Sequence, residues 1–410
     1  MKKIISFKSV LMASCIAAYF FAGCDDAVNN AITDNKAYIK GAYEKKISNI
    51  YLESSDEERA SVQMALSRRD DSRDVEVTVC ASETALEEYN KKYGKDYKLY
   101  PENLWRFESE KIIFKKGTTG APVNLLIKPV PDELIAEGSI YVIPVNIASV
   151  DGAGILNGAE TLICIIRRTP VATVGGFLKT GVAQDLYLPV NHGETLYSYT
   201  ELTIEFMIKL TEWTSAHNFA LIYNQSGNQG QIYSRIEGGG NGLAKAAFEW
   251  NIGDGEAISA APPSGKIELN KWYHVAFTFG KGQIAIYIDG ISVARLDVAR
   301  KAIVCGNGYI WRGAGCNGGY GSTPSRNSTM SAELRIWNVI RTQEQIQECM
   351  YAVNPKSQGL LGYWKMNDGS GNTVKDYAGT ADGYTVTYNT TNPSSIGLTW
   401  YTGETLTVGQ

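Results

Sequence analysis

The sequence has few of the residues that commonly bind transition metals or form disulfide frameworks. Its 410 residues include only three histidines, His192, His217 and His274. No two of the seven cysteines are spaced as Cys-x-x-Cys, the spacing of many zinc sites and of thiol redox motifs. His274 falls within a strand pattern and the other two histidines fall within loops. A metal-binding histidine triad is therefore not predicted, and neither is a nucleophile paired with a histidine.

The sequence also lacks a dense run of basic residues. Lysine and arginine together number 39 against 43 aspartates and glutamates, which gives a formal net charge of −4 at pH 7. Nucleic acids bind surfaces rich in lysine and arginine, because each phosphate contact needs a positive charge. We therefore do not predict nucleic acid as a partner.

The apolar run at the start of the chain is too short to span a membrane. It extends from Val10 to Ala22, whereas a spanning helix needs about 20 apolar residues. Lys2 and Lys3 precede the run and small residues follow it. This order of charge, apolar run and small residues is typical of a secretory signal peptide, which we expect over residues 1–23.

The leader ends in the sequence Phe-Ala-Gly-Cys, with Cys24 in the last position. This ending resembles the lipobox of bacterial lipoproteins, which implies that Cys24 is lipidated and anchors the chain. The next residues, Asp25 and Asp26, resemble the surface-export signal of Bacteroidota lipoproteins. We therefore expect a tether over residues 24–35, a lipid-anchored position on the cell-surface side of the outer membrane, and outer-membrane transport proteins as partners. A plain signal peptide with an incidental cysteine is the alternative.

The cysteines beyond the leader do not indicate a disulfide framework. They are Cys80, Cys164, Cys305, Cys316 and Cys349, an odd number. Cys80 and Cys164 lie in apolar strand patterns and are predicted to be buried thiols. Cys305 and Cys316 flank an aromatic loop, so a disulfide between them stays open as an alternative.

The most regular pattern in the chain predicts antiparallel strands. Residues 273–279 alternate between large apolar side chains and His, Ala or Thr, and residues 284–288 resume the alternation after Gly280-Lys281-Gly282. Asp289-Gly290 is a strong signal for a two-residue hairpin turn. The pattern predicts a meander with one buried face. Function should then reside in loops or on an open sheet face.

The first part of the chain, residues 36–168, shows a series of short strands around one helical segment at residues 83–90. Such a series predicts a small β-sandwich of immunoglobulin type. The predicted strands cover residues 48–52, 61–66, 75–80, 111–114, 123–129, 139–147 and 161–167.

The order of motifs in this part resembles domain of unknown function 1735, found at the N-terminus of Bacteroidota surface lipoproteins. The motifs are ALEEYN at residues 85–90, YKLYPENLW at 97–105, PVNLLIKP at 122–129 and YVIPVNIASVDG at 141–152. The resemblance implies a spacer or accessory module. Residues 169–176, which end in a glycine pair, are predicted to be a linker.

The remainder, residues 177–410, is predicted to be almost entirely strands. One helix is expected at residues 341–349, where Thr342 is a suitable N-cap with Gln345 three residues later. The predicted strands outside the meander cover residues 202–210, 219–223, 231–236, 246–252, 331–337 and 362–369.

The order of segments in this part resembles that of laminin-G-like, concanavalin-A-like jelly rolls. The segments are LTIEFMIKL, KWYHVAFTF, IAIYIDGISV, AELRIWNVIRTQEQI and GLLGYWKMNDGSGNTVKDYAG. The resemblance implies an all-β fold of two stacked sheets, with Trp272 capping the core and Arg335, Trp337 and Arg341 covering one end. Such domains often hold calcium, so calcium stays open, although no Asp-rich loop marks a site. No other cofactor is predicted.

Glycoside hydrolases also use this fold, and they need two carboxylates held at a fixed separation. The strand motifs ExDxxE and ExDxE are absent, as is DxxDxDxE. The nearest cluster is Glu249, Asp254 and Glu256, whose spacing crosses a glycine-rich turn. We therefore do not predict an enzyme. A hydrolase whose carboxylates come from different strands stays open as an alternative, as does an adhesion or structural module.

Carbohydrate binding is the chemistry that the residues favour. Sugars place apolar C–H faces on aromatic rings, while their hydroxyls bond to amide, carboxylate and guanidinium groups. Residues 306–321 are rich in glycine, aromatic residues and asparagine. Core positions are the alternative for the tryptophans. The predicted glycan-binding residues are Tyr309, Trp311, Arg312, Asn317 and Tyr320 in this segment, with Asn228 and Trp250 elsewhere.

Overall fold

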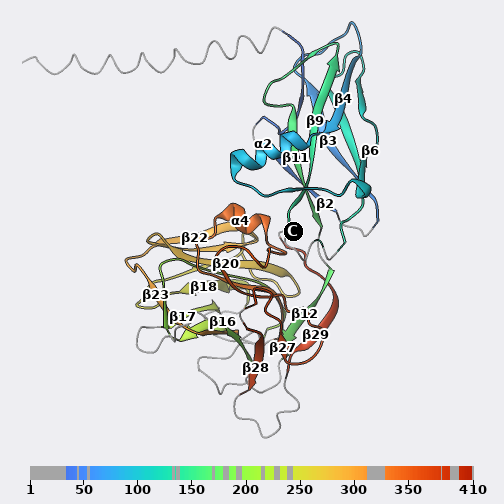
Figure 1. The fold of residues 1–410 in the computed structure, drawn as a ribbon. Coiled ribbons are helices and arrows are strands. Elements are labelled where there is room, and N and C mark those ends of the chain that lie inside the picture. The colour runs from blue at the N-terminus through green and yellow to red at the C-terminus, as the bar shows by residue number, and fades with distance from the viewer. Residues whose placement is uncertain are drawn as a thin grey trace, which may run out of the picture. The chain divides into compact units, whose positions relative to one another are not determined.

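The computed structural model of the chain describes two compact units, the first comprising Met1–Val130 and Ile140–Arg168 and the second Pro131–Ser139 and Thr169–Gln410. Figure 1 shows both units as strand-rich ribbons. The described residues are 34–43, 46–52, 56–131, 134, 139–168, 171–178, 184–190, 196–213, 218–225, 231–237, 243–311, 328–379, 381–387 and 397–408. Within these residues no helix is both long and apolar enough to cross a membrane.

The first unit contains two sheets and one longer helix. One sheet has the strand order β10-β1-β3-β8-β6, and the other has the order β2-β11-β9-β4-β7, with β5 beside β9. The elements are β1 (Lys36–Ile39), β2 (Ile47–Leu52), β3 (Glu58–Leu66), β4 (Val75–Ala81), α2 (Glu83–Tyr93), β5 (Lys98–Leu99), η1 (Glu102–Leu104), β6 (Trp105–Phe107), β7 (Lys111–Phe114), β8 (Gly120–Ile127), β9 (Tyr141–Asp151), β10 (Gly154–Ile155) and β11 (Thr161–Arg168).

Alternation along the strands builds the core of the first unit. In β4, Val75, Val77 and Val79 are buried while the residues between them are partly exposed, as expected for a strand with one face on a core. Helix α2 begins where Ser82 accepts a hydrogen bond from the backbone N–H of Ala85 at 3.2 Å. The helix ends at Gly94, whose φ of 61° is left-handed.

The second unit holds two larger sheets and the short helix α4. Its elements are β12 (Val171–Phe177), β13 (Gln184–Pro189), β14 (Leu196–Tyr199), β15 (Leu202–Glu212), β16 (Asn218–Gln225), β17 (Gln231–Glu237), η2 (Leu243–Lys245), β18 (Ala247–Asn251), β19 (Ala257–Ala260), β20 (Trp272–Gly280), β21 (Gln283–Ile288), β22 (Ile291–Asp297), β23 (Ile303–Gly306), β24 (Gly308–Trp311), β25 (Ser328–Trp337), α4 (Gln343–Glu348), β26 (Leu360–Trp364), β27 (Thr373–Val374), β28 (Gly383–Thr387) and β29 (Thr399–Thr405).

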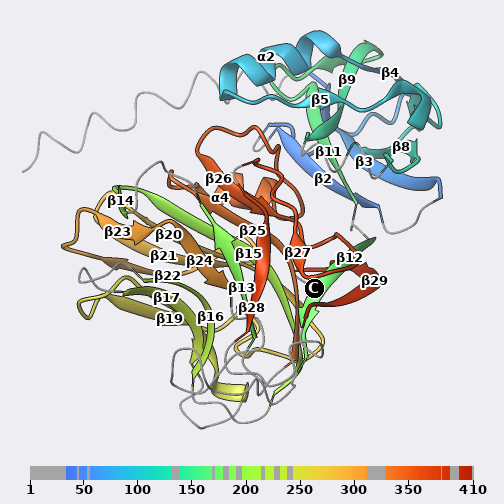
Figure 2. The same ribbon diagram turned by 60° about the horizontal axis from the view of Figure 1, so that its bottom comes forward.

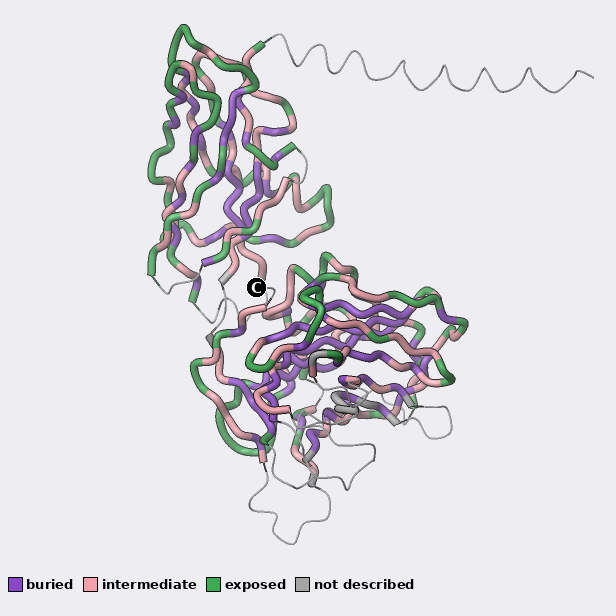
Figure 3. The backbone as a smooth tube through the Cα atoms, turned by 180° about the vertical axis from the view of Figure 1, so that it is seen from behind, coloured by how far each residue is buried: buried purple, intermediate pink, exposed green. Residues whose placement is uncertain are grey.

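The two large sheets of the second unit stack on one apolar core. The first, which we call the helix-covered sheet, has the order β22-β21-β20-β15-β25-β12-β29 with β26 beside β25; the second, the tyrosine sheet, has the order β19-β18-β17-β16-β24-β13-β28-β27. Figure 2 shows the two layers, and Figure 3 shows that buried residues dominate their strands. One apolar cluster joins Phe206 and Phe277 of the first sheet to Trp250 and Trp311 of the second. The prediction of an all-β chain with two successive sandwiches is confirmed.

The meander of residues 272–294 folds as expected, but its strands β20 and β21 are buried on both faces. Strands β20 and β21 pair in antiparallel register, and Asp289 and Gly290 both have positive φ, 51° and 75°, as a two-residue hairpin requires. The prediction of a single buried face is wrong. Ala276 packs under α4 against Ile346, so the helix covers the face that would otherwise be exposed.

The expected linker at residues 169–176 is largely a strand. Strand β12 pairs with both β25 and β29. Its two glycines do not act as hinges, because a Cβ on Gly176 would lie 2.4 Å from the carbonyl oxygen of Thr329 and a Cβ on Gly175 would lie 2.8 Å from Met366. The glycine pair therefore permits close packing of neighbouring strands.

Candidate functional site

Strand β17 has one buried face and one partly exposed face. Ile232, Ser234 and Ile236 are buried against the core. Tyr233 and Arg235 alternate with them and are only partly buried, so they lie on the outer face of the tyrosine sheet. The outer face therefore carries the aromatic and charged groups that could contact a ligand.

The strand registers align tyrosines across this outer face. Residues that pair directly across strands point to the same side of a sheet. Tyr233 pairs with Tyr223, Tyr223 with Ile310, Ile310 with Tyr187, and Tyr187 with Tyr384. We call Tyr233, Tyr187 and Tyr384 the tyrosine row. Neighbouring strands lie about 4.8 Å apart, so the row spans roughly 19 Å from β17 to β28.

One end of the row contains two rings in contact. The ring centroids of Tyr187 and Tyr384 lie 5.3 Å apart at an interplanar angle of 44°, and Tyr384 is 47% exposed. A Cβ on Gly308 would lie 2.3 Å from the ring of Tyr187. The ring thus occupies the space above a residue without a side chain. Burial and the neighbouring Tyr384 raise the pKa of Tyr187, which keeps its hydroxyl protonated and able to donate at neutral pH.

The other end of the row is polar and centres on Arg235, whose Nη2 contacts two carboxylates. Nη2 of Arg235 lies 2.9 Å from a carboxylate oxygen of Glu237 and 3.0 Å from one of Glu249. The guanidinium also lies 5.4 Å from the ring centroid of Tyr233. Asn251 donates to the Tyr233 hydroxyl at 3.0 Å. These contacts fix the orientation of an aromatic ring beside amide and carboxylate groups.

Three predicted site residues lie in the core instead of on a binding surface. Trp250, Tyr309 and Trp311 are each 0% exposed, so their rings cannot stack on a ligand, and the prediction for them is corrected. Trp250 donates to the carbonyl of Thr278 at 3.2 Å and Trp311 to the hydroxyl of Ser331 at 3.1 Å. Both bonds cross from the tyrosine sheet to the helix-covered sheet, so these indoles join the two layers.

The other predicted site residues cannot be placed. Arg312, Asn317, Tyr320 and Asn228 lie outside the described residues. The same is true of Cys24, the predicted lipidation site. Their roles remain predictions.

The carboxylates considered for hydrolysis lie in two separate ion-pair groups. Glu249 binds Arg235 on the outer face. Asp254 and Glu256 both pair with Arg300, next to a turn in which Asp254 has a positive φ of 52°. These three carboxylates, which lie close together in the sequence, therefore do not form a single group of side chains.

Histidine and cysteine side chains contribute no metal site within the described part of the chain. No group of three or more His, Cys, Asp or Glu side chains is placed there to hold a metal. His274 is buried, with Nε2 3.4 Å from Glu205. Cys305 is a free thiol with 0% exposure, so the alternative of a disulfide from Cys305 to Cys316 is wrong. Its side chain belongs to the apolar core, and burial raises its pKa to about 12.

The tyrosine row was not predicted from the sequence, although part of its signal is present there. In the segment QIYSRIE at residues 231–237, Tyr233 and Arg235 alternate with isoleucine and serine, which indicates an outward face. Tyr187 and Tyr384 could not be joined to them, because their proximity depends on the pairing of β13 with β28.

Two family models match separate parts of the chain. Residues 33–154 match the model of an N-terminal domain family. Residues 183–347 match the model of the concanavalin A-like lectin/glucanases superfamily. A comparison with curated proteins found no significant match.

Several solved structures resemble the chain at low identity. A candidate carbohydrate-binding protein from Bacteroides ovatus is 22% identical, with 90% of this chain and 97% of that chain covered and a TM-score of 0.48. A two-domain protein of unknown function from Bacteroides fragilis is 11% identical, with 75% and 98% covered and a TM-score of 0.31. EndoBT-3987 of Bacteroides thetaiotaomicron, solved with a Man5GlcNAc product, is 23% identical, with 32% and 31% covered and a TM-score of 0.28.

All three TM-scores lie below 0.5, so we base the proposed function on the side chains of the site. The family matches agree with the two sandwiches seen in the structure. The chain thus carries a concanavalin A-like lectin/glucanase domain over residues 183–347, preceded by a separate N-terminal family domain.

Proposed function

We propose that the second unit binds an extended oligosaccharide on the outer face of the tyrosine sheet. The observation that carries the proposal is the strand register that sets Tyr233, Tyr187 and Tyr384 in one row. Aromatic rings bind the apolar faces of sugar rings, and a row of them suits a ligand with repeated sugar units. Amide and carboxylate groups at the Tyr233 end would bind the sugar hydroxyls.

The charges at this end favour a neutral glycan. Arg235 already has two carboxylate partners, Glu237 and Glu249. The guanidinium is therefore not an available counter-charge for a sulfate or carboxylate on the ligand, and the second carboxylate would repel one. We expect neutral oligosaccharides to bind more tightly than sulfated ones of the same length.

The same contacts favour binding over hydrolysis. A retaining or inverting glycosidase needs one carboxyl that gives a proton and one carboxylate that attacks or activates water. In this structure Arg235 bridges Glu237 and Glu249, and one oxygen of each carboxylate is held in an ion pair with the same guanidinium. We propose a non-catalytic role. Release of new reducing ends from any member of a glycan panel would overturn it.

We further propose that the protein is a lipoprotein on the cell-surface side of the outer membrane, where it passes captured glycan to transport proteins. The support is the leader that ends at Cys24 and the acidic pair Asp25 and Asp26. Cys24→Ala should shift the protein from the membrane fraction to the soluble fraction. External protease should digest the wild-type protein on intact cells, and protection there would contradict surface exposure.

The binding proposal is tested with the mature chain on an array of neutral and sulfated oligosaccharides. Tyr384→Ala removes the most exposed ring of the row and should weaken binding about tenfold, or ~1.4 kcal/mol. Tyr51→Ala is the matched control, because Tyr51 is 58% exposed and lies in the first unit. Equal loss of binding in both variants, or in neither, would remove the tyrosine row as the site.

A further inference from the structure

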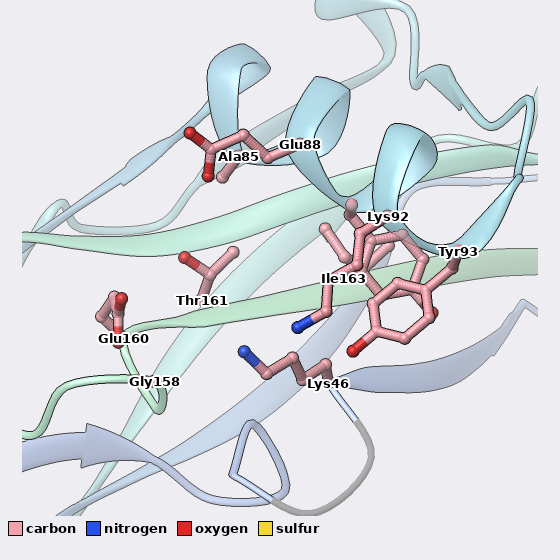
Figure 4. A pocket seen from close by; sticks show the side chains of 10 residues that line it. Lys46, Ala85, Glu88, Lys92, Tyr93, Gly158, Glu160, Thr161 and Ile163 are labelled. Carbon is pink, nitrogen blue, oxygen red and sulfur yellow. The ribbon is translucent and has the colours of Figure 1, made fainter.

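The first unit has a small cavity beside helix α2 that is unrelated to the tyrosine row. Its volume is about 180 Å³, below the roughly 300–1,000 Å³ of pockets that hold drug-sized ligands. Residues from α2, from the start of β11 and from the segment before β2 line it, as Figure 4 shows. A ligand of monosaccharide size fits such a cavity.

Helix α2 presents one face to the cavity. Ala85, Glu88, Tyr89, Lys92 and Tyr93 all line it, and their spacing of three or four residues places them along one side of a helix. The cavity therefore contains an aromatic wall and charged groups supplied by a single rigid element. The ring centroids of Tyr89 and Tyr93 lie 4.6 Å apart, and Tyr93 is 44% exposed.

Two ammonium groups converge in this cavity. Figure 4 shows Lys46 and Lys92 reaching it from different elements with their amino ends pointing toward one another. Neither lysine has a carboxylate partner among the described residues, although Lys92 lies 5.3 Å from the ring centroid of Tyr93. Like charges held near one another repel, and a bound anion would remove the repulsion.

The backbone holds Lys46 in place at some conformational cost. Its φ is 58°, a left-handed value that residues with a side chain rarely adopt. Its carbonyl accepts from the N–H of Ile163 at 2.8 Å, and its own N–H donates to the carbonyl of Gly41 at 3.2 Å. Strained backbone fixed by hydrogen bonds is a feature of ligand-binding positions.

Two carboxylates, Glu160 and Glu88, also line the cavity. Oε2 of Glu160 is buried without a hydrogen-bond partner, which is costly for a carboxylate oxygen. Glu88 also has no ion pair among the described residues. Hydroxyl groups of a ligand would supply the missing donors.

We propose that this cavity binds a carboxylate-bearing monosaccharide unit. Its carboxylate lies between Lys46 and Lys92, its hydroxyls donate to Glu160 and Glu88, and its ring face packs on Tyr93. The formal charges of the two lysines and the two glutamates in the cavity sum to zero. A doubly charged inorganic anion therefore gains less than a singly charged ligand that also carries donors, and sulfate has no hydroxyl for Glu160. The inference does not depend on glycan binding by the second unit.

The test is calorimetric titration of the mature chain with D-glucuronate, D-glucose and sodium sulfate. Glucuronate should bind at least about tenfold more tightly than glucose or sulfate. Lys46→Gln and Lys92→Gln should each weaken glucuronate binding about tenfold. Lys91→Gln is the matched control, because Lys91 lies on the same helix, is exposed, and does not line the cavity.

The outcomes separate this proposal from its alternatives. Equal binding of glucose would show that the lysines do not select a carboxylate, and equal binding of sulfate would show a simple anion site. Either result overturns the proposal, as does unchanged glucuronate binding in Lys46→Gln and Lys92→Gln. Thermal unfolding of each variant confirms that it is folded. Tyr384→Ala should leave glucuronate binding unchanged, so failure here is distinguishable from failure of the tyrosine-row proposal.

Discussion

Glu205 and Arg335 face each other on neighbouring strands β15 and β25, with Oε2 of Glu205 3.2 Å from Nη1 of Arg335 and both side chains 0% exposed. Nε of Arg341 lies 3.0 Å from the other oxygen of the same carboxylate. Arg335 also donates to the carbonyls of Cys349 and Met350 at 2.7 and 3.1 Å. This buried network attaches α4 and the segment after it to the helix-covered sheet.

The network predicts a specific loss of stability in acid. Burial by itself raises the pKa of Glu205, but Arg341, His274 and Arg335 outweigh burial and lower it to about 2 from an ordinary value of 4.5. A carboxyl whose pKa is lower in the folded state stabilises the protein above the unfolded value. That stabilisation should be lost as the pH falls from about 4.5 toward 2, as measured by chemical denaturation at several pH values.

Glu205→Gln should remove this pH dependence and destabilise the second unit by about 3–5 kcal/mol, because Arg341 loses its carboxylate partner in the core and Arg335 keeps only Glu333. Glu344→Gln, an exposed change on α4, is the control and should cost less than about 0.5 kcal/mol. A Glu205→Gln protein as stable as wild type at pH 7 would contradict a structural role for the network.

The close approach of Tyr187 to Gly308 predicts an indirect route to loss of binding. Gly308→Ala places a methyl group where the Tyr187 ring now lies, so the ring must leave the row. We expect glycan binding to weaken about as much as in Tyr187→Ala, roughly tenfold. Gly120→Ala is the control, since no atom lies within 4 Å of a Cβ built there. Retention of full glycan affinity by Gly308→Ala would show that the ring position is unimportant.

The cap of α4 predicts a local effect on stability. Thr342 and Gln345 form a capping box, with the Gln345 N–H donating to the Thr342 hydroxyl at 3.2 Å and the Thr342 N–H donating to the Gln345 side chain at 2.9 Å. Thr342→Ala should destabilise by about 1 kcal/mol, with faster hydrogen exchange in α4. Thr342→Ser keeps the hydroxyl and should behave as wild type. Unchanged exchange in Thr342→Ala would refute the role of the cap.

Burial predicts which thiols react. Desolvation raises the pKa of both Cys164 and Cys305 to about 12, so at pH 8 only about one thiol in 10⁴ is ionised. Iodoacetamide at pH 8 should leave both unmodified in the folded chain. Cys80, which was predicted to be buried but is partly exposed, and the partly exposed Cys349 should react before these two, as mass spectrometry of peptides would reveal. Rapid labelling of Cys305 in the folded protein would contradict its core position.

Local patterns predicted most elements of the fold. Alternation located β15, β17 and β20, the Asp289-Gly290 turn located the hairpin after β21, and Thr342 located the start of α4. These features depend on neighbours in the sequence, which is why the sequence reveals them. The role of Trp311 was not predictable in the same way, because an aromatic residue in a glycine-rich segment can face either the core or solvent.

The sequence by itself determined that the chain is built from strands, since side-chain alternation and turn residues act over a few residues. Only the tertiary structure decided which aromatic rings face outward together. Tyr187, Tyr233 and Tyr384 come from strands distant in sequence, and long-range pairing sets their register. The tertiary structure also decided that Trp250 and Trp311 are buried. Hydrogen bonds to the opposite sheet orient their indoles, and such bonds form only when the two layers stack.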